Sequence, residues 1–248
     1  QLAGTATAAG RLAWGQGLRG VWPRGAAAWR RLRRLAWRHR QFPAVNAPHA
    51  FVNALQDSLA LAVVLALAGP AAAGLFGLTV RVVMAPTSLI GGALSEVLLG
   101  RAAQAVREGG PLAPMVRRAA AVLALCALPV AGGLMLAGPA LFALAFGPDW
   151  REAGEWARWL APCMAGRLVV GPLTVLPMLL DRQPTAMAFS VVGNALYVLA
   201  LALTLVAGGG MALASVSISV VMGLYFAAYL CWLLRLAQAP RRRPESRA

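Results

Sequence analysis

The chain has 248 residues, of which 60% are hydrophobic and 12% are charged, and its mean hydropathy is +0.68. A soluble domain of this length cannot bury so much apolar surface, so the composition excludes a soluble globular protein and indicates a membrane protein. The formal net charge of +15 is of a size found in nucleic-acid-binding proteins. Because the arginines flank long apolar stretches, membrane topology explains them better, and we expect no nucleic acid partner.

The N-terminal part, residues 1–41, is predicted to be the remnant of a preceding helix followed by a basic cytoplasmic linker. The chain begins at Gln1 without the pattern of a secretory signal peptide, so the simplest interpretation is a piece of a longer polypeptide. Within residues 26–40, Trp29 and Leu32 fall near one helical face with arginines around them. This pattern is typical of an interfacial helix on an anionic leaflet, although a solvated basic linker is equally compatible with it.

Six apolar stretches follow, and we predict that they form a six-helix transmembrane bundle over residues 42–236. The Gly69-Pro70 pair should end the first stretch, and Pro86 should kink the second. Three prolines should break the fourth. The predicted spans are about 48–69, 74–100, 116–137, 155–180, 184–207 and 211–236.

Two further segments are predicted not to cross the membrane. The segment GPALFALAFG at 138–147 is shorter than the roughly 20 residues that a transmembrane helix needs, so we expect it to re-enter the membrane or to lie at its outer surface. Residues 237–248 are predicted to be a basic cytoplasmic tail. The predicted fold class is therefore all-α, a polytopic membrane protein whose six helices form one bundle.

Arginines are concentrated in every second gap between the apolar stretches. Seven fall within residues 24–40 and four within 101–118. The gap at 69–75 has none, and the gap at 137–152 has only Arg151, which nearby carboxylates offset. Because cationic loops stay on the cytoplasmic side of a membrane, we predict that both ends of the six-helix block lie in the cytoplasm.

Four ionisable residues fall within the predicted spans: Asp57, Arg81, Glu96 and Arg167. At the helical rise of 1.5 Å per residue, Asp57 and Arg167 lie about 18 Å, and Arg81 roughly 10–13 Å, from the outer ends of their helices. Glu96 lies deeper, near the cytoplasmic end, where it reaches inner-leaflet water or Arg101. A charge that faces lipid costs at least about 2.5–3.5 kcal/mol at mid-bilayer, so the other three should face a shared interior or a watery cavity.

Two interpretations of this charged layer stay open. It is either a cationic cavity for an anionic substrate, with Asp57 holding an arginine or carrying a proton, or a structural arrangement built on an Asp57–Arg81 ion pair. Asn53, in the same predicted helix as Asp57, is either a substrate ligand or a residue that hydrogen-bonds to a neighbouring helix. The candidate substrate-binding residues are therefore Arg81, Arg167, Asp57 and Asn53.

The chain lacks recognisable catalytic and metal-binding patterns. No GxxxxGK[ST] loop is present, so nucleotide hydrolysis by that route is excluded. The three cysteines, Cys126, Cys163 and Cys231, are far apart and lie in or near apolar stretches, which predicts buried packing rather than a disulfide framework or a zinc site. We therefore expect no enzyme activity, no metal site and no cofactor.

Two strings of residues carry a resemblance to a known family. They are AAAGLFGLTVRVVMAPTSLIGGA at 71–93 and FGPDW at 146–150. With these strings, the chain resembles the second half of bacterial polysaccharide and oligosaccharide flippases, which belong to the multidrug/oligosaccharidyl-lipid/polysaccharide exporter superfamily. The resemblance covers about 42–236, and Arg81 matches the family's arginine in this helix. The other two residues of the charged layer match no motif of the family and rest on depth alone.

The resemblance implies two six-helix bundles around a central cavity that opens alternately to each side of a bacterial inner membrane. This chain would supply the second bundle, and its partner would be the missing N-terminal bundle of the same polypeptide. The implied substrate is an oligosaccharide linked to undecaprenyl pyrophosphate, which would move among membrane lipids from the cytoplasmic to the periplasmic leaflet.

Three rival functions stay open. A drug or cation antiporter of the same superfamily should have an acidic cavity, whereas the candidate cavity contains arginines. A membrane-embedded glycan-assembly enzyme should have a large outer loop with catalytic groups. A structural membrane subunit should not need charges within its spans.

Overall fold

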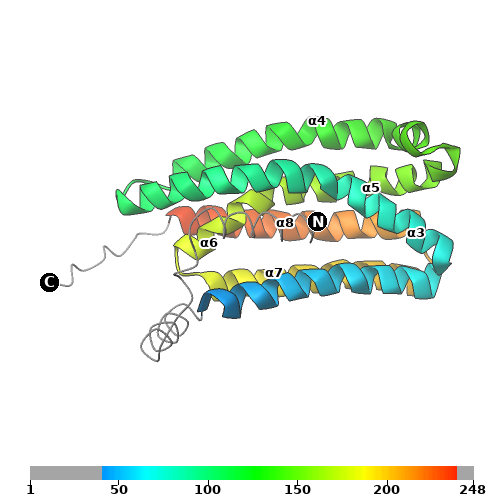
Figure 1. Ribbon diagram of the computed structural model, residues 1–248, viewed down its shortest axis with the longest axis horizontal. Helices are drawn as coiled ribbons and strands as arrows, with labels where there is room; N and C mark the ends of the chain where they lie inside the picture. Colours follow the sequence, from blue (N-terminus) through cyan, green and yellow to red (C-terminus); the bar gives the residue numbers. More distant parts are fainter. Residues whose placement is uncertain (1–40, 239–248) are drawn as a thin grey trace, which may run out of the picture. The chain divides into compact units, whose positions relative to one another are not determined.

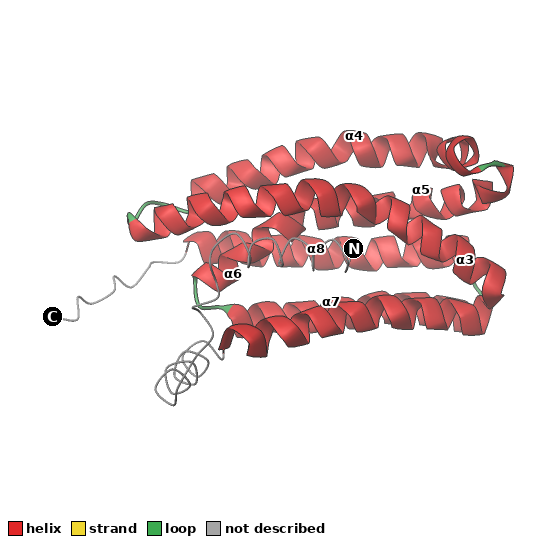
Figure 2. Cartoon of the chain, viewed as in Figure 1, coloured by secondary structure: helices red, strands yellow, loops and turns green. Residues whose placement is uncertain are grey.

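The computed structural model describes residues 41–238, and it describes side chains from residue 54 onward. Within that range the secondary structure is helical throughout, without strands, and the helices are joined by short loops (Figure 2). The chain divides into two compact units, Gln1–Ala47 and Pro48–Ala248, and the bundle belongs to the second. The predicted helix remnant, the basic segment 26–40 and the tail after residue 238 lie outside the described residues.

The described elements are mostly long apolar helices. Five helical stretches between residues 54 and 238 are long and apolar enough to cross a membrane, which confirms the all-α polytopic membrane fold. In chain order the elements are α3 (Gln41–Arg107), α4 (Ala113–Phe146), the 3-10 helix η2 (Pro148–Trp150), α5 (Arg151–Val170), the 3-10 helix η3 (Gly171–Val175), α6 (Leu176–Leu179), α7 (Gln183–Val206) and α8 (Met211–Gln238).

The predicted count of six membrane helices differs from the five that the described residues contain. The difference arises in α3, which includes both of the first two predicted spans. Gly69 interrupts its helical geometry with φ of 89° and ψ of 173°, a backbone conformation that glycine adopts readily. The chain reverses direction at this point (Figure 1). We call residues 48–68 the first arm of α3 and residues 70–107 its second arm.

The prolines have unequal effects. The fourth predicted span breaks as expected, because Pro172 lies in η3, although Pro162 is accommodated inside α5. Helix α3 continues through Pro86. Segment 138–147 does not form a separate element, because its residues up to Phe146 continue α4; its position at the outer surface of the membrane stays a prediction. Continued helix satisfies the backbone hydrogen bonds of this segment internally, as a membrane requires.

Helices α4 and α5 cross with their backbones in contact. A Cβ atom on Gly154 would lie 2.6 Å from the carbonyl oxygen of Gly138 and 2.6 Å from Cα of Pro139. A Cβ atom on Gly138 would lie 2.8 Å from the carbonyl oxygen of Gly154. Small residues permit such close approach between membrane helices, so this pair of glycines fixes the position of α5 against α4.

Helix α5 also forms hydrogen bonds with two other elements. Thr79 Oγ1 in the second arm of α3 donates to the carbonyl oxygen of Ala153 at 3.1 Å. Ser219 Oγ in α8 donates to the carbonyl oxygen of Trp159. These bonds join α5 to the second arm and to α8, and they place α5 in the core of the bundle.

The outer surface of the bundle is apolar, as contact with lipid requires. Leu136 and Leu144 of α4 are 85% and 86% exposed, and large exposed apolar surfaces of this kind mark membrane contact. The prediction of buried packing is confirmed for Cys163 but wrong for Cys126 and Cys231, which are exposed. An apolar stretch in a membrane protein has a lipid-facing side, so hydropathy alone does not place a residue in the core.

Most of the arginines in and beside the loops lie at one end of the bundle, and Arg151 at the start of α5 lies at the other. The α3–α4 loop, the α6–α7 turn and the end of α8 lie at the first end, whereas the turn between the two arms of α3, the α4–α5 connection and the α7–α8 turn lie at the opposite end (Figure 1). We call the first the arginine-bearing end. Its arginines include Arg107 at the end of α3, Arg117 and Arg118 in the first turns of α4, Arg182 before α7, and Arg235 in the last turn of α8.

Candidate substrate-binding cleft

A cleft of about 330 Å³ lies between the two arms of α3 and helix α7. Its polar lining consists of Asp57 and Ser58 from the first arm, Arg81 from the second arm, and Tyr197 from α7. The Ser58 hydroxyl donates to the carbonyl oxygen of Ala54 at 3.0 Å, within its own helix. Asp57, Arg81 and Tyr197 therefore supply the side chains most able to recognise a ligand.

Asp57 and Arg81 reach the same cleft because the chain turns back at Gly69. Asp57 lies 12 residues before Gly69 (69 − 57), and Arg81 lies 12 residues after it (81 − 69). At 1.5 Å per residue, both positions are about 18 Å from the turn. A bilayer with its headgroups is about 40–45 Å thick, so with the turn at one surface both charges lie near the middle of the membrane.

Asp57 and Arg81 do not form an ion pair in this cleft. Among residues 54–238 the ion pair within 4.0 Å joins Arg158 to Glu155. Asp57 Oδ1 instead accepts a hydrogen bond from Gln56 Nε2 at 3.2 Å. Both charged side chains are exposed to the cleft, and the Arg81 guanidinium keeps its donors free of the other described residues.

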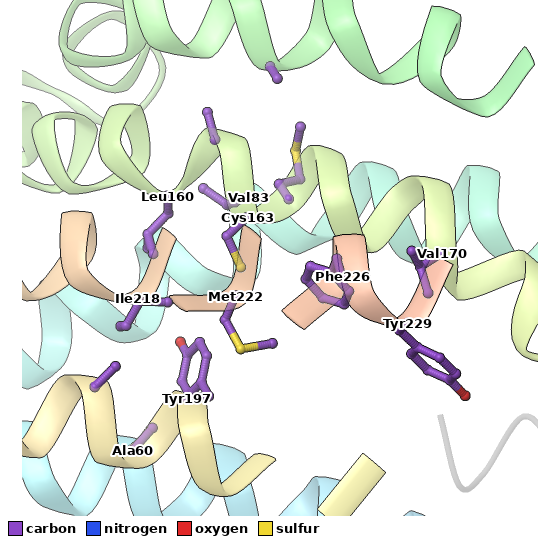
Figure 3. Packing of buried hydrophobic residues seen from close by; sticks show 14 of the residues in the cluster. Ala60, Val83, Leu160, Cys163, Val170, Tyr197, Ile218, Met222, Phe226 and Tyr229 are labelled. Carbon is purple, nitrogen blue, oxygen red and sulfur yellow. The ribbon is translucent and has the colours of Figure 1, made fainter. Parts of the chain in front are cut away.

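Arg167 lies next to this cleft but does not line it. It is exposed and lies in the last turn of α5, where the helix dipole favours a cation. Arg167 and Asp57 both lie near Tyr197, whose side chain points toward Cys163 and Met222 (Figure 3). The predicted charged layer is thus assembled in part: Asp57 and Arg81 share one cleft, and Arg167 lies outside its lining.

The remaining intramembrane candidates have different positions. Asn53 lies in the first arm, one turn before Asp57, and its side chain is outside the described residues. Glu96 is exposed on the second arm and does not line the cleft. Sequence reasoning missed Tyr197, although its position gives a signal: membrane tyrosines gather at interfaces, whereas Tyr197 lies in the middle of α7.

The arrangement suits the binding of an anion. A guanidinium presents a planar set of donors that matches phosphate and carboxylate oxygens in pairs. The apolar surroundings strengthen such contacts, because the local dielectric constant is low. Within residues 54–238 there is no group of three or more His, Cys, Asp or Glu side chains that could hold a metal ion.

A family model described as polysaccharide biosynthesis protein matches residues 27–155, which is more than half of the 248-residue chain. The chain belongs to this family of polysaccharide biosynthesis proteins. The family match includes both arms of α3, and with them Asp57 and Arg81, and it ends in the first turn of α5. Tyr197 and Arg167 lie beyond it. No characterised protein and no solved structure matches the chain.

Proposed function

We propose that the protein is a flippase that moves lipid-linked oligosaccharide from the cytoplasmic to the periplasmic leaflet of a bacterial inner membrane. The substrate is an oligosaccharide carried on undecaprenyl pyrophosphate, a precursor for polysaccharide assembly. One observation carries the proposal: the Arg81 guanidinium, which forms no ion pair with residues 54–238, lies in a mid-membrane cleft of a chain from a polysaccharide biosynthesis family.

The physical problem of flipping explains why an arginine belongs there. A diphosphate loses its hydration when it enters the hydrocarbon, and an unpaired charge at that depth is costly. Arg81 offers charged donors at about the depth where this cost is highest. The undecaprenyl chain stays in lipid, because it is apolar, while the diphosphate and the sugars pass along the cleft. Asp57, across the cleft, offsets the charge of Arg81 when no substrate is bound.

The cleft also indicates how much of the transport path this chain supplies. Its volume of about 330 Å³ is at the small end of the range for ligand pockets, roughly 300–1,000 Å³. It accommodates a diphosphate but not a whole oligosaccharide. We propose that a second bundle, from the N-terminal part of the same polypeptide, completes the cavity. The two bundles alternate between an inward and an outward opening without catalysing a reaction and without a cofactor.

A deletion strain tests this function. Without the full-length protein, polysaccharide is expected to be lost from the cell surface, while the lipid-linked oligosaccharide accumulates on the cytoplasmic leaflet, because its synthesis continues and its translocation stops. Extraction of the lipid pool gives the amount, and an impermeant sugar-modifying reagent applied to intact cells and to inverted vesicles gives the leaflet. An unchanged pool with raised sensitivity to cationic drugs would identify an antiporter instead. A pool that lacks the oligosaccharide would identify an assembly enzyme.

A further inference from the structure

A second hollow lies on the bundle, at the arginine-bearing end and apart from the cleft. It is a groove of about 200 Å³ between the second arm of α3 and the start of α4. Arg101 from the second arm and Arg118 from α4 line it. It shares no lining residue with the cleft, and the proposed flippase function does not use it.

The two arginines lie at matching heights. Arg101 is 6 residues before the end of α3 at Arg107 (107 − 101), and Arg118 is 5 residues after the start of α4 at Ala113 (118 − 113). At 1.5 Å per residue, they lie about 9 Å and about 8 Å from the loop that joins the helices. Both are exposed, and neither forms an ion pair within residues 54–238.

Below the arginines the groove is apolar. Leu98, Val97 and Leu94 precede Arg101 by 3, 4 and 7 residues, so they continue along the same helical face, up to about 10 Å further from the loop. Val122 follows Arg118 by 4 residues on the facing helix. Val97 and Val122 are 53% and 48% exposed. The groove therefore combines a cationic mouth with an apolar floor.

The position of the groove along the membrane matches this division. Arg101 is 32 residues past Gly69 (101 − 69), which is about 48 Å along the second arm. A bilayer with its headgroups is about 40–45 Å thick, so with Gly69 at one surface and the usual helix tilt of about 20°, Arg101 lies at the headgroups of the opposite surface. Leu94 is 25 residues past Gly69 (94 − 69), about 38 Å along the arm, where the acyl chains begin.

We infer that this groove binds an anionic phospholipid from the leaflet at the arginine-bearing end. Its phosphate lies between Arg101 and Arg118, and one acyl chain covers Leu94, Val97 and Val122. The two arginines at the mouth of the groove favour an anion, because no carboxylate of residues 54–238 lines the groove. The nearest carboxylates along the second arm are Glu96, which is outside the lining, and Glu108, which accepts a hydrogen bond from Gln104 Nε2 at 2.8 Å. The apolar floor requires that the anion carry a hydrocarbon chain.

Lipid binding to the purified full-length protein tests the site. Phosphatidylglycerol is titrated into the detergent-solubilised protein, and native mass spectrometry gives the dissociation constant. The double variant Arg101→Gln/Arg118→Gln is expected to raise this constant at least about tenfold, because each surface arginine contributes substantially to the attraction of an anionic lipid. The double variant Arg107→Gln/Arg117→Gln removes the same charge from the same end, outside the groove, and is expected to change the constant less than about twofold.

A second pair of variants separates a lipid from a bare phosphate. Ala119 lines the groove and Ala121, which is exposed on α4, does not. Ala119→Phe should fill the groove and weaken phosphatidylglycerol binding at least about tenfold, while Ala121→Phe should leave it unchanged. Equal weakening by both arginine pairs would show that only the charge of this end matters and would overturn the site. Unchanged binding in Ala119→Phe would overturn the acyl-chain contact.

Discussion

The Gly154→Ala substitution is expected to lower the midpoint of thermal unfolding of the detergent-solubilised protein by roughly 10 °C. Its new Cβ atom would lie 2.6 Å from two backbone atoms of α4, and backbone cannot move aside as a flexible side chain does. Helices α4 and α5 must therefore separate, at a cost of about 3 kcal/mol. In a protein of this size, each kcal/mol corresponds to roughly 2–4 °C.

The matched control is Gly133→Ala, in the middle of α4. A Cβ atom there meets nothing within 4 Å, and alanine stabilises a helix relative to glycine by roughly 0.5–1 kcal/mol. The control is therefore expected to unfold at the wild-type temperature or slightly above it. If Gly154→Ala unfolded at the same temperature as Gly133→Ala, the close crossing of α4 and α5 would be wrong.

The Arg81→Gln substitution is expected to reduce polysaccharide export by at least about tenfold while the protein accumulates in the membrane at its normal level. A hydrogen bond to a charged group contributes about 1.5–3 kcal/mol, which corresponds to at least about a tenfold change. Arg81 has no ion-pair partner within the described part of the chain. Its replacement by glutamine therefore breaks no ion pair there. The variant should therefore impair transport more than folding.

Two further variants sharpen the Arg81 prediction. Arg81→Lys keeps the charge but loses the paired geometry of the guanidinium, so its export should lie between wild type and Arg81→Gln. Arg151 lies at the start of α5, at the end of the bundle opposite the arginine-bearing end, and it does not line the cleft. The Arg151→Gln variant should therefore export polysaccharide normally. Surface polymer is quantified in complemented deletion cells, with membrane levels of each variant measured in parallel. If the Arg81→Gln variant exported polysaccharide at the wild-type level, Arg81 would have no role in substrate binding.

The sequence predicts most of the fold because the bilayer imposes simple rules. Stretches of about 20 apolar residues must be helices, and the Gly69-Pro70 pair marks a reversal that the structure contains. The rules fail where packing decides. Residues 138–146 continue α4 and bring Gly138 against Gly154 of α5, and a length criterion contains no information about such a partner helix. Hydropathy likewise did not separate the buried Cys163 from the exposed Cys126, since lipid and core are both apolar.

The sequence predicts the candidate site only through the depth of its charged residues along their helices. Counting along the predicted spans places Asp57 about 18 Å and Arg81 roughly 10–13 Å from the outer ends of their helices. The structure brings the two to equal distances from the turn, because the second arm starts directly after Gly69. Which side chains contact each other is set by rotamers and by helix rotation, and for this reason the open alternative of an Asp57–Arg81 ion pair required the structure. Tyr197 enters the cleft from α7, more than 100 residues further along the chain than Arg81, and no local pattern links the two.

Translocation in vesicles tests the central claim most directly. The purified full-length protein is reconstituted into vesicles that contain a fluorescent lipid-linked oligosaccharide in both leaflets, and an impermeant quencher is added outside. With wild-type protein, the label that starts in the inner leaflet should become quenched over time, because the protein moves it outward. With Arg81→Gln, quenching beyond the half that was exposed from the start should be at least about tenfold slower. Quenching by the wild-type protein no faster than in protein-free vesicles would contradict the assignment as a flippase.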